Sequence, residues 1–360
     1  WIEPLLWWLV LMAAFYTVVV CMMVILRRQW MDHERLLYPL TQVPLGMVED
    51  GEESASIKPF LKNVSMWLGL AVPLLLHGIN ALSHYFEFIG SISFIHSLPL
   101  AQNTVYFYLR FDCMWMGLAY LVNANITFSL WFFYLLIKAQ EVVFTWIGIF
   151  STENLDIFSH TFEGPTMGIL SHQTMGAMIV IVLLGLWTAR AHLWDVLQHV
   201  WQPDRRSDGD ELMSYRRAVV GTVLGLVVMT VWLWRSGIPL WAVFVYLFGA
   251  FVIFLALTRV IVEAGLAAAV QGMSGTGFLI SSVGSTSIGV AGVLGAGITL
   301  AWAGDLLVFM MAPCANGIRM LHGLGRHKKR IIVMIGMAMA IGLVGGVYAI
   351  LNIAYQYGAN

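Results

Sequence analysis

The sequence predicts an all-α polytopic transmembrane helical bundle that contains two re-entrant or broken helical units. Hydrophobic residues make up 59% of the 360 residues, charged residues make up only 11%, and the mean hydropathy is +0.80. A soluble globular domain carries about 25% charged residues. Long apolar runs alternate with short basic segments along the whole chain. We therefore interpret residues 1–360 as a single transmembrane domain.

Six uninterrupted apolar runs have about the length of a membrane-spanning helix, which needs roughly 20 residues. These predicted spans are 5–26, 64–82, 167–189, 219–234, 238–257 and 331–353. Two further apolar runs are broken by polar residues or glycines. Counting their contribution, we expect roughly seven spans plus two re-entrant or broken units.

The first broken run covers residues 110–144, which is too long for one span. The tripeptide Asn123-Ala124-Asn125 interrupts it. We predict two helices, 112–122 and 126–144, that meet at this break. Amide side chains at a helix break supply both hydrogen-bond donors and acceptors. Asn123 and Asn125 are therefore candidate binding residues.

The second broken run covers residues 259–305, and we expect the rest of the bundle to be organised around it. It contains ten glycines, a cluster of serines and threonines, and one acid near each end. Glycine allows close approach of backbones and allows a helix to break. Irregular backbone at membrane depth is tolerated only where protein buries it or where it lines a water-filled cavity. The run is thus predicted to line an internal site.

Three segments rich in Arg and Lys, 27–62, 190–217 and 319–330, are predicted to be cytoplasmic by the positive-inside rule. An even number of crossings must separate each pair of them, so both broken runs should enter the membrane and return, or cross twice. Residues 193–201 have the periodicity of an amphipathic helix lying on the membrane surface. His192, Asp195 and His199 share its polar face, which we interpret as solvated rather than as a metal site.

Seven residues are the candidate substrate- or ion-binding residues: Glu263, Asp305, Asn123, Asn125, Ser274, Thr276 and Arg259. Ionisable side chains inside membranes are functional candidates, so Glu263 and Asp305 are predicted to carry ions or protons. The glycine-rich backbone and the hydroxyls would coordinate the substrate or ion. Arg259 and Glu263 are four residues apart, and an intrahelical ion pair at the interface is the structural alternative.

No pattern in the chain indicates an enzyme, a cofactor or a metal site. The three cysteines are far apart, and residues 272–277 lack the ending of a phosphate-binding loop. The net charge of −1 does not favour nucleic acid. The chain begins at Trp1 without a methionine, so we expect it to be an internal part of a longer polypeptide.

Several local patterns resemble an uncharacterised family of large bacterial membrane proteins that is distantly similar to oligopeptide transporters. The matching patterns are Arg28-x-Trp30-x-x-His33-Glu34-Arg35-Leu36-x-Tyr38-Pro39-Leu40-x-Gln42-x-Pro44, residues 128–136, Tyr215-Arg216-x-Ala218 and Arg259-x-x-x-Glu263-Ala264-Gly265. The resemblance implies a two-fold pseudo-symmetric bundle of many helices with re-entrant hairpins. It carries over no residue role and no substrate.

Two functional hypotheses follow. The first is a secondary transporter in the bacterial cytoplasmic (inner) membrane, which moves a small polar solute, peptide- or amino-acid-like, together with protons or sodium. The second is a non-catalytic scaffold or accessory subunit of a larger membrane complex. The lipid bilayer is a partner in both, and homo-oligomers or other complex subunits are further candidate partners.

Overall fold

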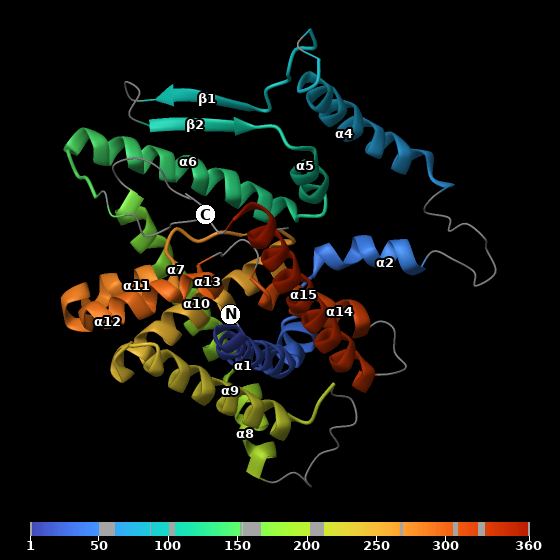
Figure 1. Ribbon diagram of the computed structural model, residues 1–360. Coiled ribbons are helices and arrows are strands. Elements are labelled where there is room, and N and C mark those ends of the chain that lie inside the picture. Colours follow the sequence, from blue (N-terminus) through green and yellow to red (C-terminus); the bar gives the residue numbers. More distant parts are fainter. Residues whose placement is uncertain are drawn as a thin grey trace.

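The computed structural model describes residues 2–49, 62–86, 88–100, 105–151, 153, 167–201, 212–266, 269–304, 309–322 and 328–358. The chain is a bundle of helices with one small antiparallel sheet at its edge (Figure 1). Parts of the three predicted basic segments, residues 50–61, 202–211 and 323–327, lie outside the described residues.

Seven helices in the described part of the chain are long and apolar enough to cross a membrane. They are α1 (Ile2–Arg28), α4 (Val64–Ser83), α6 (Ala124–Ile147), α7 (Met167–Thr188), α9 (Tyr215–Arg235), α10 (Leu240–Ala264) and α15 (Lys328–Tyr357). Six of them confirm the six predicted uninterrupted spans, and α6 comes from the first broken run. The chain therefore has the helices of an integral membrane protein.

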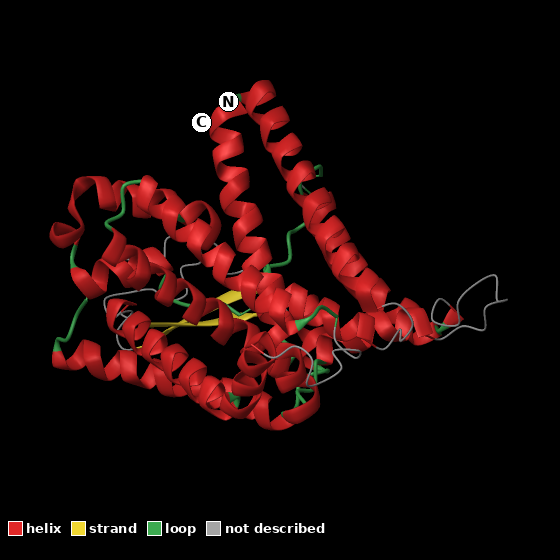
Figure 2. Cartoon of the chain, turned by 90° about the horizontal axis from the view of Figure 1, so that it is seen from below, coloured by secondary structure: helices red, strands yellow, loops and turns green. Residues whose placement is uncertain are grey.

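The core of the bundle is built from α1, α9 and α10, with α7 and α14 (Met311–His322) packed around them. Glycines on α9 bring it close to α1. A Cβ at Gly225 would lie 2.5 Å from Val18 Cγ2, and one at Gly221 would lie 2.7 Å from Cys21 Sγ. The indole of Trp232 also donates a 2.9 Å hydrogen bond to the carbonyl of Trp7. The starting end of α1 and the final end of α15 project from the same side of the body (Figure 2).

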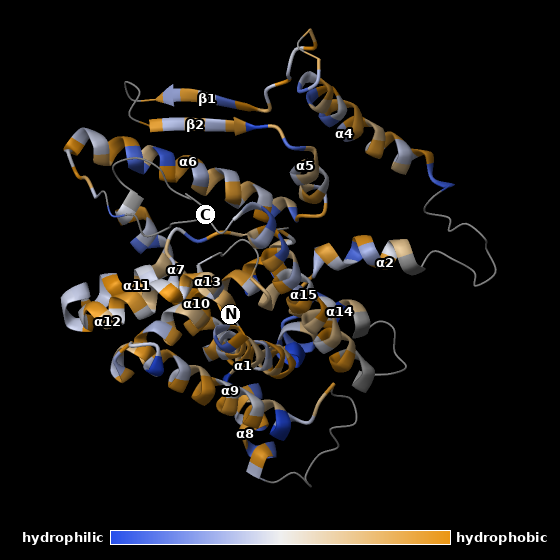
Figure 3. Ribbon diagram, in the orientation of Figure 1, coloured by the Kyte–Doolittle hydropathy of each residue, from blue (hydrophilic) through white to orange (hydrophobic). Residues whose placement is uncertain are grey.

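α10 is the central helix. Its most apolar window is 67% buried, the largest share among the seven candidate spans. By contrast, no residue of α4 is buried, and only 6% of the α6 window is buried. Hydrophobic residues run along both of these outer helices (Figure 3). Their apolar side chains are available to lipid or to another protein.

Within the described residues the fold departs from all-α where β1 (Ile95–Leu100) and β2 (Val105–Arg110) form an antiparallel hairpin. In this hairpin Ile95 lies opposite Arg110, and Leu100 lies opposite Val105. The hairpin follows α4, whose Asn80 side chain binds both the N–H and the carbonyl of Ile92 at 2.7 and 3.0 Å. The sequence predicted no strand in this stretch.

The break in the first apolar run is confirmed. α5 (Cys113–Ala119) is followed by α6, and the Asn123 side chain caps α6 by accepting a 3.0 Å hydrogen bond from the Asn125 N–H. The run is not two full crossings, because α5 has only seven residues and rises about 10 Å. Three helices of crossing length, α4, α6 and α7, then separate the first two basic segments. The predicted topology requires an even number of membrane crossings between these two segments, and three helices of crossing length do not provide it.

The second broken run is also discontinuous in the structure. It contains α11 (Gly275–Val283), α12 (Ser285–Ile298) and the single turn α13 (Leu300–Ala303). Gly284 separates α11 from α12 with φ of 80°, and Gly289 kinks α12 with φ of 74°. These are left-handed conformations that glycine adopts without steric penalty. α11 packs on α10, so the broken run lies against the central helix (Figure 1).

The predicted surface helix is α8 (Arg190–Trp201), and its apolar face is open to the surroundings. Trp194, Leu197 and Trp201 are 63%, 46% and 84% exposed. The prediction of a solvated His192 is wrong. This side chain is buried, because its Nε2 lies 2.8 Å from the Ile25 carbonyl oxygen at the end of α1.

Candidate functional site

The segment that follows α1 has an irregular backbone and docks on the end of α10. α1 continues into a π-helical turn, η1 (Gln29–His33), and the chain then passes through left-handed residues at Arg35 and Tyr38, with φ of 53° and 49°. A short 3₁₀ turn, η2 (Pro39–Thr41), leads into α2 (Gln42–Glu49). Such conformations in non-glycine residues cost about 1–3 kcal/mol each and are held by their surroundings.

Two contacts fix this segment against α10. The N–H of Tyr38 donates a 3.1 Å hydrogen bond to the carbonyl of Val262. Gly265 ends α10 with φ of 73°, and a Cβ there would lie 2.7 Å from Pro39. Glycine is therefore required where the segment meets the helix end.

An ion pair joins the same two elements across 225 residues of sequence. Arg259 Nη2 lies 2.7 Å from Glu34 Oε2, and the two side chains are 23% and 13% exposed. The other carboxylate oxygen of Glu34 accepts a 2.8 Å hydrogen bond from Gln29 Nε2. Both oxygens of this acid are thus occupied.

Arg259 has a second, weaker contact with Glu263, as the predicted four-residue spacing allows. Its Nε lies 3.9 Å from Glu263 Oε2, and the Glu263 side chain is 52% exposed. The expected intrahelical pair therefore exists, but it is not the main partner of Arg259. Sequence reasoning noted Glu34 in the patterned segment before the prolines, but it did not predict Glu34 as the partner of Arg259.

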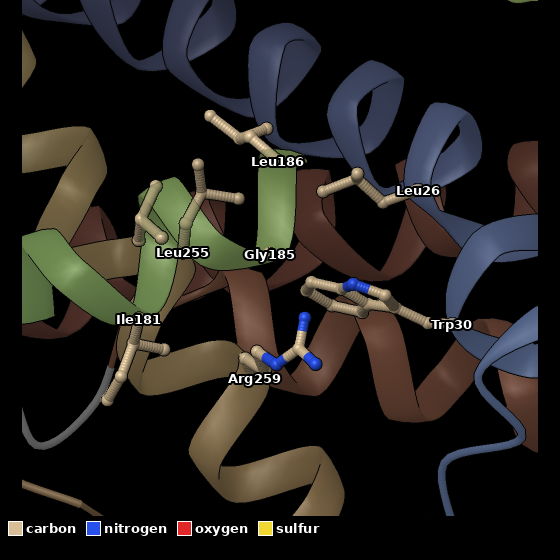
Figure 4. A pocket seen from close by; sticks show the side chains of 8 residues that line it. Leu26, Trp30, Ile181, Gly185, Leu186, Leu255 and Arg259 are labelled. Atoms are coloured by element: carbon tan, nitrogen blue, oxygen red, sulfur yellow. The ribbon is translucent and has the colours of Figure 1, made fainter. Parts of the chain in front are cut away.

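One guanidinium nitrogen of Arg259 has no partner. Nη1 is buried and makes no hydrogen bond. It faces a cavity of about 20 Å³ whose other walls are apolar, as Figure 4 shows. The lining residues are Leu26, Trp30, Ile181, Val182, Gly185, Leu186, Leu255 and Arg259. Gly185 makes room for the arginine, because a Cβ there would lie 2.9 Å from Nη1. This volume admits about one water molecule and no solute.

Polar side chains extend the ion pair toward α8 and α14. Gln29 Oε1 lies 3.2 Å from His33 Nδ1, and the His33 ring lies 5.9 Å from the His192 ring. The guanidinium of Arg319 lies 5.9 Å from the centre of the Tyr38 ring. Burial raises the pKa of Tyr38, although the positive charges of Arg319 and Arg27 lower it, so this phenol stays protonated. We call Gln29, His33, Glu34 and Arg259 the inner polar network.

A second polar cluster lies inside the bundle, where the predicted residues Ser274 and Thr276 are found. Ser274 caps α11 by accepting a 3.1 Å hydrogen bond from the Gly277 N–H. Thr276 is buried, and its Oγ1 lies 3.0 Å from Thr299 Oγ1 and 3.1 Å from the Ala296 carbonyl oxygen. The structure thus places these hydroxyls between the pieces of the broken run.

Three residues of this second cluster escaped sequence reasoning. Thr299 is fully buried and binds Thr276, while the hydroxyl of Tyr246 on α10 and the indole Nε1 of Trp302 on α13 are buried without hydrogen-bond partners. Aromatic residues in apolar runs are common at membrane interfaces. Nothing in their local sequence distinguished these two.

The whole chain, residues 1–360, matches a family described as a family of unknown function, DUF6785. The chain belongs to this family. No curated protein and no solved structure matches it. Membership in this family shows neither the expected relation to oligopeptide transporters nor the expected bacterial source.

Three predicted site residues of this DUF6785 chain remain to be placed. Asn123 and Asn125 are exposed and make their hydrogen bonds within α6, which packs chiefly against β2 and not against α11. The structure therefore does not bring the two amides to the glycine-rich run. Asp305 lies outside the described residues. Within the described residues, no group of three or more His, Cys, Asp or Glu side chains could hold a metal ion.

Proposed function

We propose that this DUF6785 protein is a secondary transporter of a small polar solute, peptide- or amino-acid-like, coupled to protons or sodium. The observation that carries the proposal is the Glu34–Arg259 ion pair. It joins the segment after α1 to the end of the central helix and leaves one guanidinium N–H facing a cavity. Arg259 lies in α10, a helix long and apolar enough to span a membrane, and ionisable groups in such helices commonly mark substrate and ion pathways.

The ion pair has the chemistry to recognise a zwitterion. A solute amine can replace Arg259 as the partner of Glu34, and a solute carboxylate can replace Glu34 as the partner of Arg259. Exchange of this kind keeps every charge paired, so it avoids the large free-energy cost of an isolated buried charge. The unpartnered Nη1 offers a further N–H to the carboxylate of such a solute.

The described conformation is closed in this proposal, because the cavity beside Arg259 admits only about one water molecule. Opening requires the segment 29–41 to separate from α10. The segment is held there by one backbone hydrogen bond, the ion pair and the contact between Pro39 and Gly265. The broken run on the other side of α10 supplies the discontinuous helices that transporters place at their binding sites.

Uptake by reconstituted vesicles tests the proposal. The purified chain in liposomes is given labelled L-alanyl-L-alanine or L-alanine under an inward proton gradient and, separately, an inward sodium gradient. We expect gradient-driven accumulation in at least one combination, reduced at least about tenfold in Glu34→Gln and Arg259→Lys, because each substitution removes the geometry of a charged hydrogen bond. Arg110→Gln is the control, since this side chain is 64% exposed in its pair with Asp112.

Accumulation no greater than in empty liposomes under both gradients would overturn the transport proposal. The second candidate function, an accessory subunit of a larger membrane complex, then gains support. The observation in its favour is that α4 and α6 expose apolar faces along their length. Cross-linking from cysteines placed on α6 in native membranes would distinguish a partner subunit or a second copy of the chain from lipid alone.

A further inference from the structure

Two buried hydrogen-bond donors in the middle of the bundle lack acceptors. They are the hydroxyl of Tyr246 and the indole N–H of Trp302. Their rings form an edge-to-face pair with centroids 6.0 Å apart, and Tyr246 is completely buried. A buried donor without a partner costs about 1–3 kcal/mol, and native proteins almost always satisfy such groups with protein, water or a ligand.

The neighbouring hydroxyls do not supply the missing acceptors. The carbonyl of Ala296 already accepts from the Thr299 N–H at 3.1 Å and from the Thr299 hydroxyl at 2.5 Å. The Thr276 hydroxyl finds its acceptor in Thr299 Oγ1 or in the same carbonyl. The Tyr246 side chain interacts with that of Thr299, but its oxygen reaches no hydrogen-bond geometry. The two groups left without partners are therefore an indole N–H, which can only donate, and a phenol hydroxyl, which can donate.

The N-terminus of α11 adds a partial positive charge at the same place. Gly275 is the first residue of this nine-residue helix, and a Cβ there would lie 3.4 Å from Tyr246 Cε2. The first turn of a helix favours negatively charged groups. Because an indole N–H can only donate, a cation has no ligand in Trp302. The group that fits this environment is an oxygen acceptor that carries negative charge.

The remaining walls are aromatic. The Trp302 ring lies 5.1 Å from the Phe15 ring and 6.3 Å from the Phe254 ring. Aromatic walls exclude water and strengthen each hydrogen bond inside the site. They also suit a small apolar side chain next to the charged group.

We propose that Tyr246 and Trp302 donate hydrogen bonds to a carboxylate of the transported solute at the N-terminus of α11. The inference rests on the proposed transport function and names the part of the solute that the broken run recognises. Thr276 and Thr299 act as positioning residues, since their mutual hydrogen bond fixes α11 against the end of α12. A ligand bound here lies against α10, the helix that also carries Arg259.

Fluorine NMR of the full chain labelled with 5-fluorotryptophan tests this site. Trp302→Phe identifies the Trp302 resonance among the fifteen tryptophans of the chain. The labelled protein is titrated with L-alanyl-L-alanine and with L-alanyl-L-alaninamide, which lacks the carboxylate. We expect the Trp302 resonance to shift saturably with the dipeptide and the amide to bind at least about tenfold more weakly, the factor that corresponds to one charged hydrogen bond.

Two variants make the test specific. Tyr246→Phe should weaken dipeptide binding at least about tenfold while preserving the fold, because the ring remains. Thr258→Val is the matched control. Thr258 is also buried on α10, but its hydroxyl binds the Phe254 carbonyl of its own helix at 2.6 Å. Binding in this variant should stay within about twofold of the unsubstituted chain.

The outcomes separate this inference from the transport proposal. If the Trp302 resonance does not shift on addition of the dipeptide, the proposed site is overturned, whether or not vesicles accumulate solute. An ordered water is then the acceptor for the two donors. Equal responses to the dipeptide and its amide overturn the carboxylate assignment. A saturable, Tyr246-dependent response without uptake supports the site and overturns transport.

Discussion

The Glu34–Arg259 ion pair should contribute measurably to the stability of the bundle, and a double-mutant cycle can measure its contribution. Glu34→Gln removes the charge but keeps an oxygen that accepts from Gln29, and Arg259→Gln removes the partner. At an effective dielectric constant of 20, two unit charges 4 Å apart attract by about 4 kcal/mol, before desolvation is subtracted. The structure places the charged atoms 2.7 Å apart with 13% and 23% of the side chains exposed.

The expected size lies between two known limits. Removing one partner of a fully buried pair costs about 3–5 kcal/mol, whereas exposed pairs contribute about 0–1 kcal/mol. For this mostly buried pair we expect each single substitution to lower the free energy of unfolding by about 2 kcal/mol. Glu263, 3.9 Å from the Arg259 Nε, limits the loss in Glu34→Gln. The coupling energy between the two sites should be about 1–2 kcal/mol.

Unfolding of the four proteins in mixed micelles, followed by the loss of helical circular dichroism, provides the assay. A second cycle on the exposed pair Arg110→Gln and Asp112→Asn is the control, and its coupling should stay below about 0.5 kcal/mol. Asparagine preserves the cap that Asp112 forms on α5. A coupling energy between Glu34 and Arg259 as small as that of the control pair would refute the role given to the ion pair.

Three further predictions follow from the packing and the helix ends. Gly249→Ala should lower the thermal midpoint, because the new Cβ would lie 2.3 Å from Phe278 Cδ1 and overpacking costs about 1–3 kcal/mol; an unchanged midpoint would show that α11 can shift freely on α10. Asn123→Ala should cost about 1 kcal/mol by removing the cap of α6, whereas Asn123→Asp should be nearly neutral in the same unfolding assay. A nitroxide at Trp201 should collide more often with oxygen than with a water-soluble nickel complex, and a nitroxide at Asp195 should show the reverse; equal accessibility would contradict an interfacial α8.

The transmembrane helices could be predicted from the sequence because the signal is local. A run of about 20 apolar residues is sufficient to identify a span. The predicted span 64–82 is observed as Val64–Ser83, and the interruption at Asn123 is observed as a helix cap. The hairpin could not be predicted in the same way. It depends on pairing between two strands, in which Ile95 lies opposite Arg110, and Pro99 within β1 argues against a strand.

The candidate site was only partly predictable for a related reason. Arg259 was recognised, but only its neighbour four residues away was visible as a partner, while Glu34 lies 225 residues away. A contact at such separation leaves no periodic pattern. Ser274 and Thr276 were recognised through their glycine-rich context. Tyr246 was not, because it stands out only through the missing hydrogen-bond partner of its buried hydroxyl, which the sequence does not reveal.

Both polar sites include a residue of α10, and the two residues lie at different distances from the start of this helix. Measured along the helix axis from the turn at Pro239, Tyr246 lies about 10 Å away and Arg259 about 30 Å away, at 1.5 Å per residue. A tilt of about 10° would displace the Tyr246 end by about 2 Å and the Arg259 end by about 5 Å. If the proposed ligand at α11 tilted α10 about this turn, the displacement at Arg259 would be about threefold larger than at Tyr246. That displacement would be large enough to separate the 2.7 Å contact between Arg259 and Glu34.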